Sequence, residues 1–470
     1  MRKINEECGV FGIISPEPIS AAAYTASSLL ALQHRGQEGA GIATFYSDRS
    51  MICHKNVGLV NDIFGEFLRH VPSTHVAVGH VRYSTTGGNT VENTQPIETV
   101  HSKLTCATAH NGNITNAAEI RSEMVRHEGK IFFTTNDSEI INMLLVENFI
   151  KCKSIEKALI KVMDTLEGAF SLVIATADKL IAARDRSGFR PLCMGKLGNA
   201  TVFASESCAL DCIGAKFVRD IEPGEVVSVD LNGNETVMRQ AKNGVKRGLC
   251  VFELIYLARS DSIIDGVSVY NARLEMGRAL YRQNPIEADI VCGVPDSGLD
   301  AALGYSLESG IPYAPAFVKN RYMGRSFIEP SQKSRERTVN VKLNPLRAQI
   351  EGKRIVLIDD SIVRGTTSER MIKPLKDMGV KEVHLRISSP PFKHPCYFGT
   401  DIDSEENLIA NHLSVDEICK KIGADSLEYL DINNLLKIGS EKGVKYCDGC
   451  FTGNYPIPVS GSSKHKFDDK

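Results

Sequence analysis

The spacing of apolar residues along this sequence predicts a succession of strands and helices. Short apolar runs that end in turn residues are typical of strands, whereas apolar residues at every third or fourth position are typical of helices. By the first criterion we expect strands at 76–81, 170–175, 180–183, 202–204, 226–229, 289–294 and 356–358. By the second we expect helices at 22–32, 137–150, 154–166, 270–282 and 366–378. This order of elements predicts a protein of the mixed α/β and α+β classes.

Pro374 conflicts with the last of these helices. An interior proline removes a backbone hydrogen bond and clashes with the preceding turn. We therefore expect this helix either to bend after Ile372 or to end early and restart. In the helix at 270–282, the interior Gly277 suggests close packing against a neighbour.

A polar cluster directly follows the strand at 356–358. Asp359 and Asp360 stand where that strand should end. The turn between them and the next helix includes Arg364, Gly365, Thr366 and Thr367. Ligands of α/β sheets bind at the carboxyl ends of strands, and N–H groups at a helix start suit a phosphate. The carboxylates suit ribose hydroxyls or a hydrated Mg²⁺; the alternative is an ordinary solvated strand end.

This spacing resembles the signature with which phosphoribosyltransferases bind 5-phosphoribosyl 1-diphosphate (PRPP). The resemblance implies a type I phosphoribosyltransferase domain with a parallel sheet, in which Asp359, Asp360 and residues 364–367 bind PRPP. A second strand end, Pro295-Asp296-Ser297-Gly298, looks like the diphosphate loop of that family, although the same residues also make a good turn. The resemblance implies one Mg²⁺ per subunit, held by Ser297, Asp359 and Asp360.

Residues 319–344 are dense in basic and small residues. They include Lys319, Arg321, Tyr322, Arg325, Arg335 and Arg337. We expect a lid that orders over PRPP, excludes water and meets the charge of the diphosphate, because a reactive substrate must be kept from hydrolysis. The alternative is a mobile basic loop.

Cys8 stands ahead of an apolar stretch at 9–13 that predicts the first strand. It could be a core residue, since free cysteine packs as a small hydrophobe. Polar clusters beside strands or helix starts follow at 34–38, 79–85, 110–114 and 136–139. Their order and spacing resemble the glutaminase domain of the N-terminal-nucleophile amidotransferases, which implies two sheets sandwiched between helical layers.

That resemblance implies a role for each cluster. Cys8 would be the nucleophile with its own α-amino group as the base, so residues 1–7 would be removed as a propeptide. Asn111 and Gly112 would form the oxyanion hole. Arg82 would pair with the α-carboxylate of glutamine, and Asp137 with its α-ammonium group. Taken singly, each of these two charges is more typical of a surface ion pair.

Composition excludes several classes of protein. With 55 basic and 57 acidic residues, a net charge of −2 gives no electrostatic case for binding nucleic acid or anionic membranes. No run approaches the ~18 apolar residues that a membrane span needs, and residues 1–7 are too short for a secretory signal. Thirteen cysteines spread over 470 residues do not suggest a disulfide framework. We therefore expect a cytoplasmic protein.

From Glu6 to Pro458 the sequence resembles the amidophosphoribosyltransferase family, the glutamine–PRPP amidotransferases. The resemblance implies a glycosyltransferase that hydrolyses glutamine at Cys8 and passes ammonia to C1 of PRPP. The products would be 5-phosphoribosylamine, glutamate and diphosphate, in the first committed step of de novo purine biosynthesis. Purine nucleotides as feedback inhibitors and a homotetramer are also implied.

The domains then divide at an aperiodic run rich in Gly, Asn, Lys and Arg at 232–247. We expect a propeptide at 1–7, a glutaminase domain at 8–240, a phosphoribosyltransferase domain at 241–460 and a polar tail at 461–470. One alternative is another glutamine amidotransferase, which would lack the stretch 356–367. A nucleotide-sensing regulator is a second alternative, but it would not need an oxyanion hole.

Cys447 and Cys450 form a C-x₂-C turn, a spacing typical of metal ligands, which Cys250 and Cys396 can join. Zinc and iron–sulfur clusters both accept four thiolates. One branch of the family carries a structural [4Fe–4S] cluster together with a propeptide, and this resemblance implies one cluster per subunit on these four cysteines. Zinc is the alternative. Cys106, Cys193 and Cys292 lie in apolar runs and are expected in the core.

Overall fold

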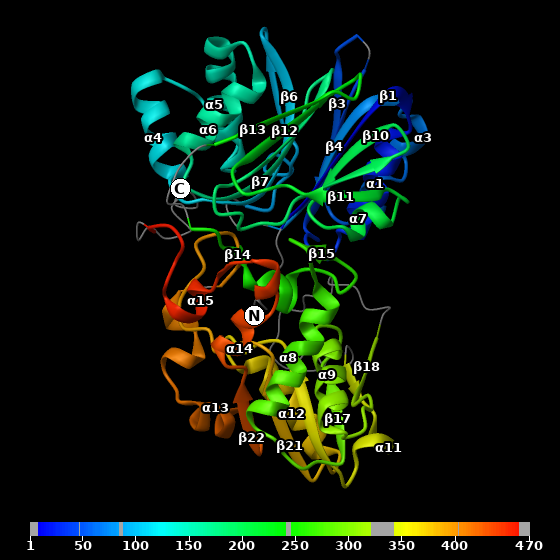
Figure 1. Ribbon diagram of the computed structural model, residues 1–470, viewed down its shortest axis with the longest axis vertical. Coiled ribbons are helices and arrows are strands. Elements are labelled where there is room, and N and C mark those ends of the chain that lie inside the picture. The colour runs from blue at the N-terminus through cyan, green and yellow to red at the C-terminus, as the bar shows by residue number, and fades with distance from the viewer. Residues whose placement is uncertain are drawn as a thin grey trace.

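The computed structural model describes residues 8–46, 48–83, 88–240, 246–320, 343–402 and 404–459. They form two lobes stacked along the long axis of the molecule (Figure 1). The N-terminal lobe holds two antiparallel sheets, and the C-terminal lobe holds a parallel sheet. The expected propeptide, the polar tail and residues 321–342 of the expected lid lie outside the described residues.

The first sheet has seven strands in the order β11-β9-β10-β1-β4-β2-β3. The strands are β1 Gly9–Ile19, β2 Gly39–Phe45, β3 Met51–Val57, β4 Thr74–Arg82, β9 Cys193–Leu197, β10 Ala200–Ala204 and β11 Lys216–Asp220. Four helices pack on its outer face through one apolar cluster. They are α1 Ala21–Ala31, α2 Val60–Phe64, α3 Phe67–His70 and α7 Cys208–Asp211.

The second sheet has six strands in the order β13-β12-β8-β7-β6-β5. The strands are β5 Ile97–His101, β6 Leu104–Ile114, β7 Gly168–Ala175, β8 Lys179–Arg184, β12 Glu225–Asp230 and β13 Glu235–Arg239. Its outer face is covered by α4 Ala117–Glu128, α5 Ser138–Cys152 and α6 Ile155–Thr165. Val10, Val78 and Val173 belong to the apolar layer between the two sheets. The lobe is therefore a helix–sheet–sheet–helix sandwich, as expected.

The C-terminal lobe is built on a four-stranded parallel sheet in the order β17-β20-β21-β22. The strands are β17 Ile290–Gly293, β20 Arg354–Asp359, β21 Glu382–Ile387 and β22 Ser426–Tyr429. Helices α8 Val269–Gln283 and α9 Leu299–Ser309 cover one face, and α12 Thr366–Asp377 and α13 Val415–Ile422 cover the other. In β20, Val356 faces the first pair and Leu357 the second, which explains the unbroken apolar run.

Short elements complete this lobe. They are β14 Leu249–Cys250, the π-helix η1 Glu253–Leu257, β15 Ile263–Ile264, β16 Val267–Ser268, β18 Phe317–Lys319, β19 Leu343–Pro345, α11 Arg347–Ile350, η2 Glu405–Asn407, η3 Ile409–Asn411, α14 Ile432–Lys437, η4 Ser440–Lys442, β23 Tyr446–Cys447 and α15 Gly449–Thr452. Strands β14 and β23 pair in parallel and tie the start of the lobe to its end.

The predictions made for Gly277 in α8 and for Pro374 in α12 have different outcomes. Helices α8 and α9 pack so closely that a Cβ at Gly277 would lie 1.8 Å from the carbonyl oxygen of Ala301, which confirms the close approach. Helix α12 runs through Pro374, so the expectation that it ends and restarts is wrong. The proline removes a single N–H, and Ile372 and Leu375 on either side stay buried in one core.

The other predicted elements are present with shifted ends. The run at 232–247, which seemed aperiodic, contains strand β13, paired with β12 along its full length. Cys106, Cys193 and Cys292 are buried, as expected. In the described part of the chain, no helix combines the length and the hydropathy needed to cross a membrane.

Candidate active sites

Cys8 lies at the entry to β1 and is 8% exposed. Its thiol donates a hydrogen bond to the carbonyl oxygen of Tyr83 at 3.4 Å, and its own carbonyl accepts one from Nε of Arg35 at 3.0 Å. Because Gly9 pairs with Val81, Cys8 stands at the same sheet end as the last residues of β4. The residue is therefore held from two sides, as a positioned nucleophile requires.

Asn111 and Gly112 lie next to each other on β6. Asn111 is 1% exposed, and among the described residues its Nδ2 has no hydrogen-bond partner. A buried amide donor without a partner costs free energy, so it is suited to a ligand that brings an oxygen. Gly112 has φ +147°, and a Cβ there would lie 2.0 Å from the carbonyl oxygen of Ala169. The close approach of β7 therefore requires glycine.

Arg82 and Asp137 are both buried. Burial lowers the pKa of Arg82, while the nearby Cys8, Glu38 and Asp137 act in the opposite direction. Burial would raise the pKa of Asp137, but His110 and backbone N–H groups outweigh it and leave that pKa below its ordinary value. A guanidinium and a carboxylate are the groups that recognition of an α-amino acid requires.

Two histidines join the sheets behind these residues. His80 of β4 hydrogen-bonds through Nε2 to the carbonyl oxygen of His110 on β6 at 3.0 Å. Nδ1 of His110 contacts Ser138 Oγ at 3.0 Å and Asp137 at 3.5 Å. Burial lowers the pKa of His80 to about 3, so this link is neutral. The strand that ends at Arg82, the strand of Asn111 and the start of α5 thus meet at one place.

The second predicted site lies at the carboxyl ends of β17 and β20. The hydroxyl of Ser297 donates to Oδ1 of Asp360 at 2.5 Å, and Ser361 donates to Oδ2 of the same carboxylate. Oδ1 of Asp359 accepts the N–H of Asp360 at 3.0 Å. A Cβ at Gly298 would lie 2.3 Å from the carbonyl oxygen of Ile358, so the loop presses against the strand end. Carboxylate and hydroxyl oxygens are donors that Mg²⁺ accepts, so these residues fit that ion.

The turn before α12 takes the form expected of an anion site. Gly365 precedes the helix with φ +78°, a conformation that favours glycine. Thr366 and Thr367 are the first two residues of the helix, where backbone N–H groups have no partner within the helix. Together with the positive end of the helix dipole, these groups suit a phosphate. Arg364 lies beside them in the chain.

The two ends of the expected lid are held together. Lys319 of β18 pairs with Leu343 of β19 in a short antiparallel ladder. Nζ of Lys319 forms an ion pair with Asp296, which lies in the loop that carries Ser297. The segment therefore leaves and rejoins the fold beside the predicted diphosphate loop. Its residues Arg321, Tyr322, Arg325, Arg335 and Arg337 lie outside the described residues.

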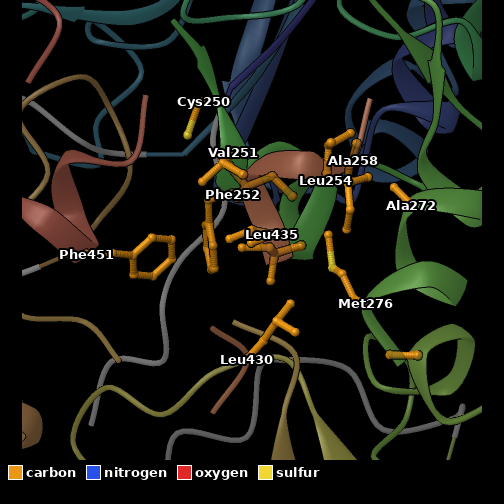
Figure 2. Close-up of a cluster of buried hydrophobic side chains, with 14 of the residues drawn as sticks. Cys250, Val251, Phe252, Leu254, Ala258, Ala272, Met276, Leu430, Leu435 and Phe451 are labelled. Atoms are coloured by element: carbon orange, nitrogen blue, oxygen red, sulfur yellow. The ribbon is translucent and has the colours of Figure 1, made fainter. Parts of the chain in front are cut away.

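The four candidate cluster cysteines share one apolar cluster, part of which Figure 2 shows around Cys250 and Phe451. Cys250 and Cys447 are paired residues of β14 and β23. Burial raises the pKa of the Cys450 thiol well above its ordinary value, and the nearby Cys396, Cys250 and Cys447 raise it further. All four are free thiols. Distant segments therefore bring the four cysteines close together.

The surroundings of these thiols fit an iron–sulfur cluster. The N–H of Phe398 donates to the sulfur of Cys396 at 3.4 Å, a contact of the kind that stabilises cluster thiolates. Tyr397 and Tyr455 pack edge to face beside them, with ring centroids 5.2 Å apart. Within the described residues, no three His, Cys, Asp or Glu side chains are arranged to hold a single metal ion. Both the cluster and the Mg²⁺ stay predictions.

Sequence reasoning missed the residues that join the lobes. Asn113, the residue after the predicted oxyanion hole, donates to the carbonyl oxygen of Tyr397 at 2.9 Å. Arg190 donates to the carbonyl oxygen of Phe398 at 2.6 Å, and Glu253 binds two arginines of the other lobe. A signal existed for Glu253, which is a lone carboxylate inside the apolar run Val-Phe-Glu-Leu-Ile. Such a charge is buried only with partners.

Comparison with known proteins is consistent with both lobes. A sequence model of the glutamine amidotransferase domain matches residues 80–212. The amidophosphoribosyltransferase of Archaeoglobus fulgidus is 45% identical over 456 residues, covering 97% of this chain and 99% of that protein. The amidophosphoribosyltransferase of a Synechocystis species is 46% identical over 460 residues, covering 97% of this chain and 92% of that protein.

Solved structures agree. The glutamine PRPP amidotransferase of B. subtilis complexed with ADP and GMP superimposes with a TM-score of 0.89 at 42% identity, covering 97% of this chain and 99% of that chain. The structure of the allosteric regulatory enzyme of purine biosynthesis gives a TM-score of 0.90 at 43% identity, covering 97% of both chains. On sequence and fold over nearly its whole length, this chain belongs to the amidophosphoribosyltransferase family.

Proposed function

We propose that this chain hydrolyses glutamine at Cys8 and transfers the ammonia to C1 of PRPP, as an enzyme of purine biosynthesis. The products are 5-phosphoribosylamine, glutamate and diphosphate. One observation carries the proposal: the chain combines a buried cysteine and a buried amide donor that has no partner among the described residues with a serine–aspartate pair at a parallel strand end. The first arrangement suits amide hydrolysis and the second suits a phosphorylated sugar.

In the glutaminase step the free α-amino group of Cys8 takes the thiol proton. The thiolate then attacks the side-chain amide carbon of glutamine, and the carbonyl electrons move onto the oxygen. Asn111 and Gly112 stabilise this oxyanion. The C–N bond breaks, the α-amino group returns the proton to the departing ammonia, and water hydrolyses the resulting thioester to release glutamate. Arg82 and Asp137 hold the α-carboxylate and α-ammonium group of the substrate.

In the transfer step Asp359, Asp360 and the turn at 364–367 bind PRPP. Ammonia attacks C1, the bond from C1 to the diphosphate oxygen breaks, and the ammonia nitrogen loses a proton. Ser297, Asp359 and Asp360 would hold Mg²⁺, which when bound neutralises the charge of the diphosphate. The segment 319–344 closes over the substrate, because water would otherwise compete with ammonia. Free ammonia at neutral pH is mostly ammonium, which favours direct transfer between the lobes.

The rest of the assignment follows the family. We divide the chain into a propeptide at 1–7, a glutaminase domain at 8–240 and a phosphoribosyltransferase domain at 241–460, with a polar tail at 461–470. Cys250, Cys396, Cys447 and Cys450 would hold a [4Fe–4S] cluster, which when bound ties distant segments together. Since the B. subtilis relative was solved with ADP and GMP, purine nucleotides are the proposed inhibitors. A cytoplasmic homotetramer completes the proposal.

The direct test is diphosphate release from PRPP by the purified chain, with glutamine or ammonium chloride as the nitrogen source. We expect release with either source, and glutamate in equal amount when glutamine is used. Glutamate release without PRPP turnover would indicate a different glutamine amidotransferase. Nucleotide binding with neither activity would indicate a regulator.

A further inference from the structure

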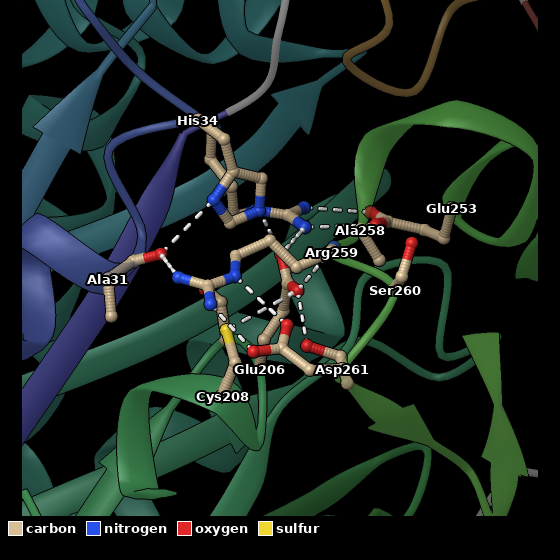
Figure 3. Close-up of polar contacts among 12 residues, drawn as sticks. Ala31, His34, Glu206, Cys208, Glu253, Ala258, Arg259, Ser260 and Asp261 are labelled. Carbon is tan, nitrogen blue, oxygen red and sulfur yellow. Dashed lines mark hydrogen bonds and ion pairs between the residues drawn. The ribbon is translucent and has the colours of Figure 1, made fainter. Parts of the chain in front are cut away.

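Four charged side chains are fully buried where the two lobes meet. Arg35, Arg190 and Glu206 come from the N-terminal lobe, and Glu253 comes from η1 at the start of the C-terminal lobe. None of the four is more than 1% exposed. Figure 3 shows Glu206 and Glu253 on two sides of this centre, with His34 beside them. Buried charges are costly unless paired, and here two positive charges face two negative ones.

Glu253 organises the arginines of the facing lobe. Its carboxylate accepts two hydrogen bonds from Arg35, Nη1 to Oε2 at 3.0 Å and Nη2 to Oε1 at 2.8 Å. Arg190 donates to the same Oε1 at 3.3 Å. A bidentate arginine–carboxylate pair fixes the plane of the guanidinium as well as its position. Removing Glu253 would take away the carboxylate that the two arginines share, while Arg35 would keep its ion pair with Glu206 at 2.6 Å.

The fixed guanidinium of Arg35 reaches the nucleophile. With both Nη atoms engaged by carboxylates, Nε points to the carbonyl oxygen of Cys8 at 3.0 Å. The carbon of that carbonyl is bonded to the Cα that carries the α-amino group and, through Cβ, the thiol. Holding it sets the peptide plane after Cys8, and so limits where the thiol and the amine can lie. Glu253 is therefore connected to Cys8 through a single side chain, that of Arg35.

Arg190 links the same carboxylate to a second segment of the C-terminal lobe. Its guanidinium donates to the carbonyl oxygen of Phe398 and to the hydroxyl of Thr400. A Cβ at Gly399 would lie 2.9 Å from Nη2 of Arg190, so this segment lies directly against the guanidinium. Arg190 of the N-terminal lobe therefore binds two separate parts of the C-terminal lobe, Glu253 and the segment at 398–400.

We propose that Glu253 is a positioning residue for the glutaminase step. Its carboxylate, supplied by the transferase lobe, orients Arg35, and Arg35 orients the Cys8 main chain for attack. The nucleophile is therefore fully aligned only when the two lobes are docked. This inference rests on the proposed function, because it assigns Glu253 to the reaction at Cys8.

The test compares Glu253→Gln with the wild-type full-length enzyme. The amide keeps the shape of the side chain and removes its charge. We expect kcat for glutamine hydrolysis to fall about tenfold to a hundredfold, since a small misplacement of a reacting group costs that much. KM for glutamine should change by less than about twofold, because Arg82 and Asp137 still bind the substrate. PRPP turnover with ammonia should be unchanged.

Asp265→Asn is the matched control. Asp265 also joins the lobes, through an ion pair with Arg184 at 2.7 Å that lies outside the Arg35 network. Its φ of +47° is one that asparagine tolerates. It should leave both activities unchanged. Should Glu253→Gln fail to fold, Glu253→Asp, which keeps the charge but shortens the reach, is judged by the same criteria.

The outcomes separate the claims. A lower glutaminase kcat at constant KM, with normal ammonia-dependent turnover, supports the inference. An unchanged kcat, a parallel loss of both activities, or an equal loss in Asp265→Asn overturns it. Wild-type glutaminase activity that survives alkylation of Cys8 would instead contradict the proposed function, and this inference with it.

Discussion

At Cys8, two of the three groups that an N-terminal nucleophile uses are held by neighbours. The thiol donates to the carbonyl oxygen of Tyr83, and the carbonyl accepts from Arg35. The third group is the α-amino base, which exists only after residues 1–7 are removed. An amide nitrogen at the same place cannot accept the thiol proton, whereas an α-amine with a pKa near ~8 can.

We therefore predict that the active protein begins at Cys8. Intact-mass measurement and N-terminal sequencing should give a chain cut between Glu7 and Cys8, with cleavage driven by attack of the thiol on the preceding carbonyl. A chain that cannot be cut should lack glutaminase activity and keep ammonia-dependent turnover. Active protein that still began at Met1 would exclude the role given to the Cys8 amine.

Asn111 gives a second prediction at this scale. Asn111→Ala should lower kcat for glutamine hydrolysis by about a hundredfold to a thousandfold, the usual effect of removing one oxyanion donor. KM should change little, because among the described residues Nδ2 makes no hydrogen bond that the substitution would break. Asn148→Ala is the control. Asn148 lies on α5, and its side-chain amide donates a hydrogen bond to the carbonyl oxygen of Leu144 in the same helix. A rise in KM with an unchanged kcat would indicate that Asn111 binds the substrate instead.

The candidate catalytic residues could be named from sequence because their motifs have a fixed order and spacing, and the roles given to them stay predictions. Residues that position them were not, because their partners are distant in sequence. Glu253 contacts Arg35 from more than two hundred positions away. A lone carboxylate in an apolar run indicates a buried partner, but not which one.

At the scale of elements, the sequence predicted best where burial leaves a strong pattern. Strand β20 is apolar on both faces and was located, whereas β13 is mostly exposed and its pattern was too weak to see. Helix α12 kept its course through Pro374 because its buried face outweighs one missing hydrogen bond. Packing of this kind cannot be read from local sequence alone.

The end of β11 carries a pH-sensitive carboxylate. Burial, followed by the charge of Asp265, raises the pKa of Asp220 to about 7. The folded state then holds a proton that the unfolded chain releases near its ordinary pKa of ~3.9. Since the unfolded state binds fewer protons between these values, stability falls as pH rises from about 4 to about 7.

Asp220→Asn should remove this dependence. We expect the variant to match the wild type at pH ~3 and to be more stable at pH ~8, by up to about 4 kcal/mol at roughly 1.4 kcal/mol per pKa unit. Urea unfolding at the two pH values measures it, with the exposed Asp178→Asn as control. Equal effects at both pH values, or destabilisation at pH ~8, would show that Asp220 is charged in the folded state.

At the scale of the whole molecule, the two lobes meet between the site proposed for glutamine hydrolysis and the site proposed for ammonia transfer. The segment after Cys396 contacts the N-terminal lobe through the carbonyl oxygens of Tyr397 and Phe398, and the Phe398 ring stacks on Phe189 at 4.2 Å. Motifs predicted each lobe separately. The docking of one lobe on the other could not be predicted, because it depends on contacts between segments without local patterns.

The candidate cluster includes Cys396, which directly precedes the residues of this interface. Its presence can be tested on the whole protein. Protein purified without oxygen should be brown and contain about four iron atoms per chain. Cys447→Ser should give insoluble or less stable protein, because the ligands tie distant segments together, whereas Cys53→Ser outside the cluster should not. Zinc in place of iron would contradict the cluster and leave the ligand set standing.

The central claim is that two separate sites act in series within one chain. The measurement is PRPP-dependent diphosphate release with glutamine or with ammonia, alongside glutamate release. It is made on two variants, Cys8→Ala and the double variant Asp359→Asn with Asp360→Asn. We predict that Cys8→Ala loses glutamine-dependent release and keeps ammonia-dependent release. The double variant should lose release with both nitrogen sources and keep basal glutamine hydrolysis. Near-normal PRPP turnover in the double variant, or use of glutamine without Cys8, would contradict the account.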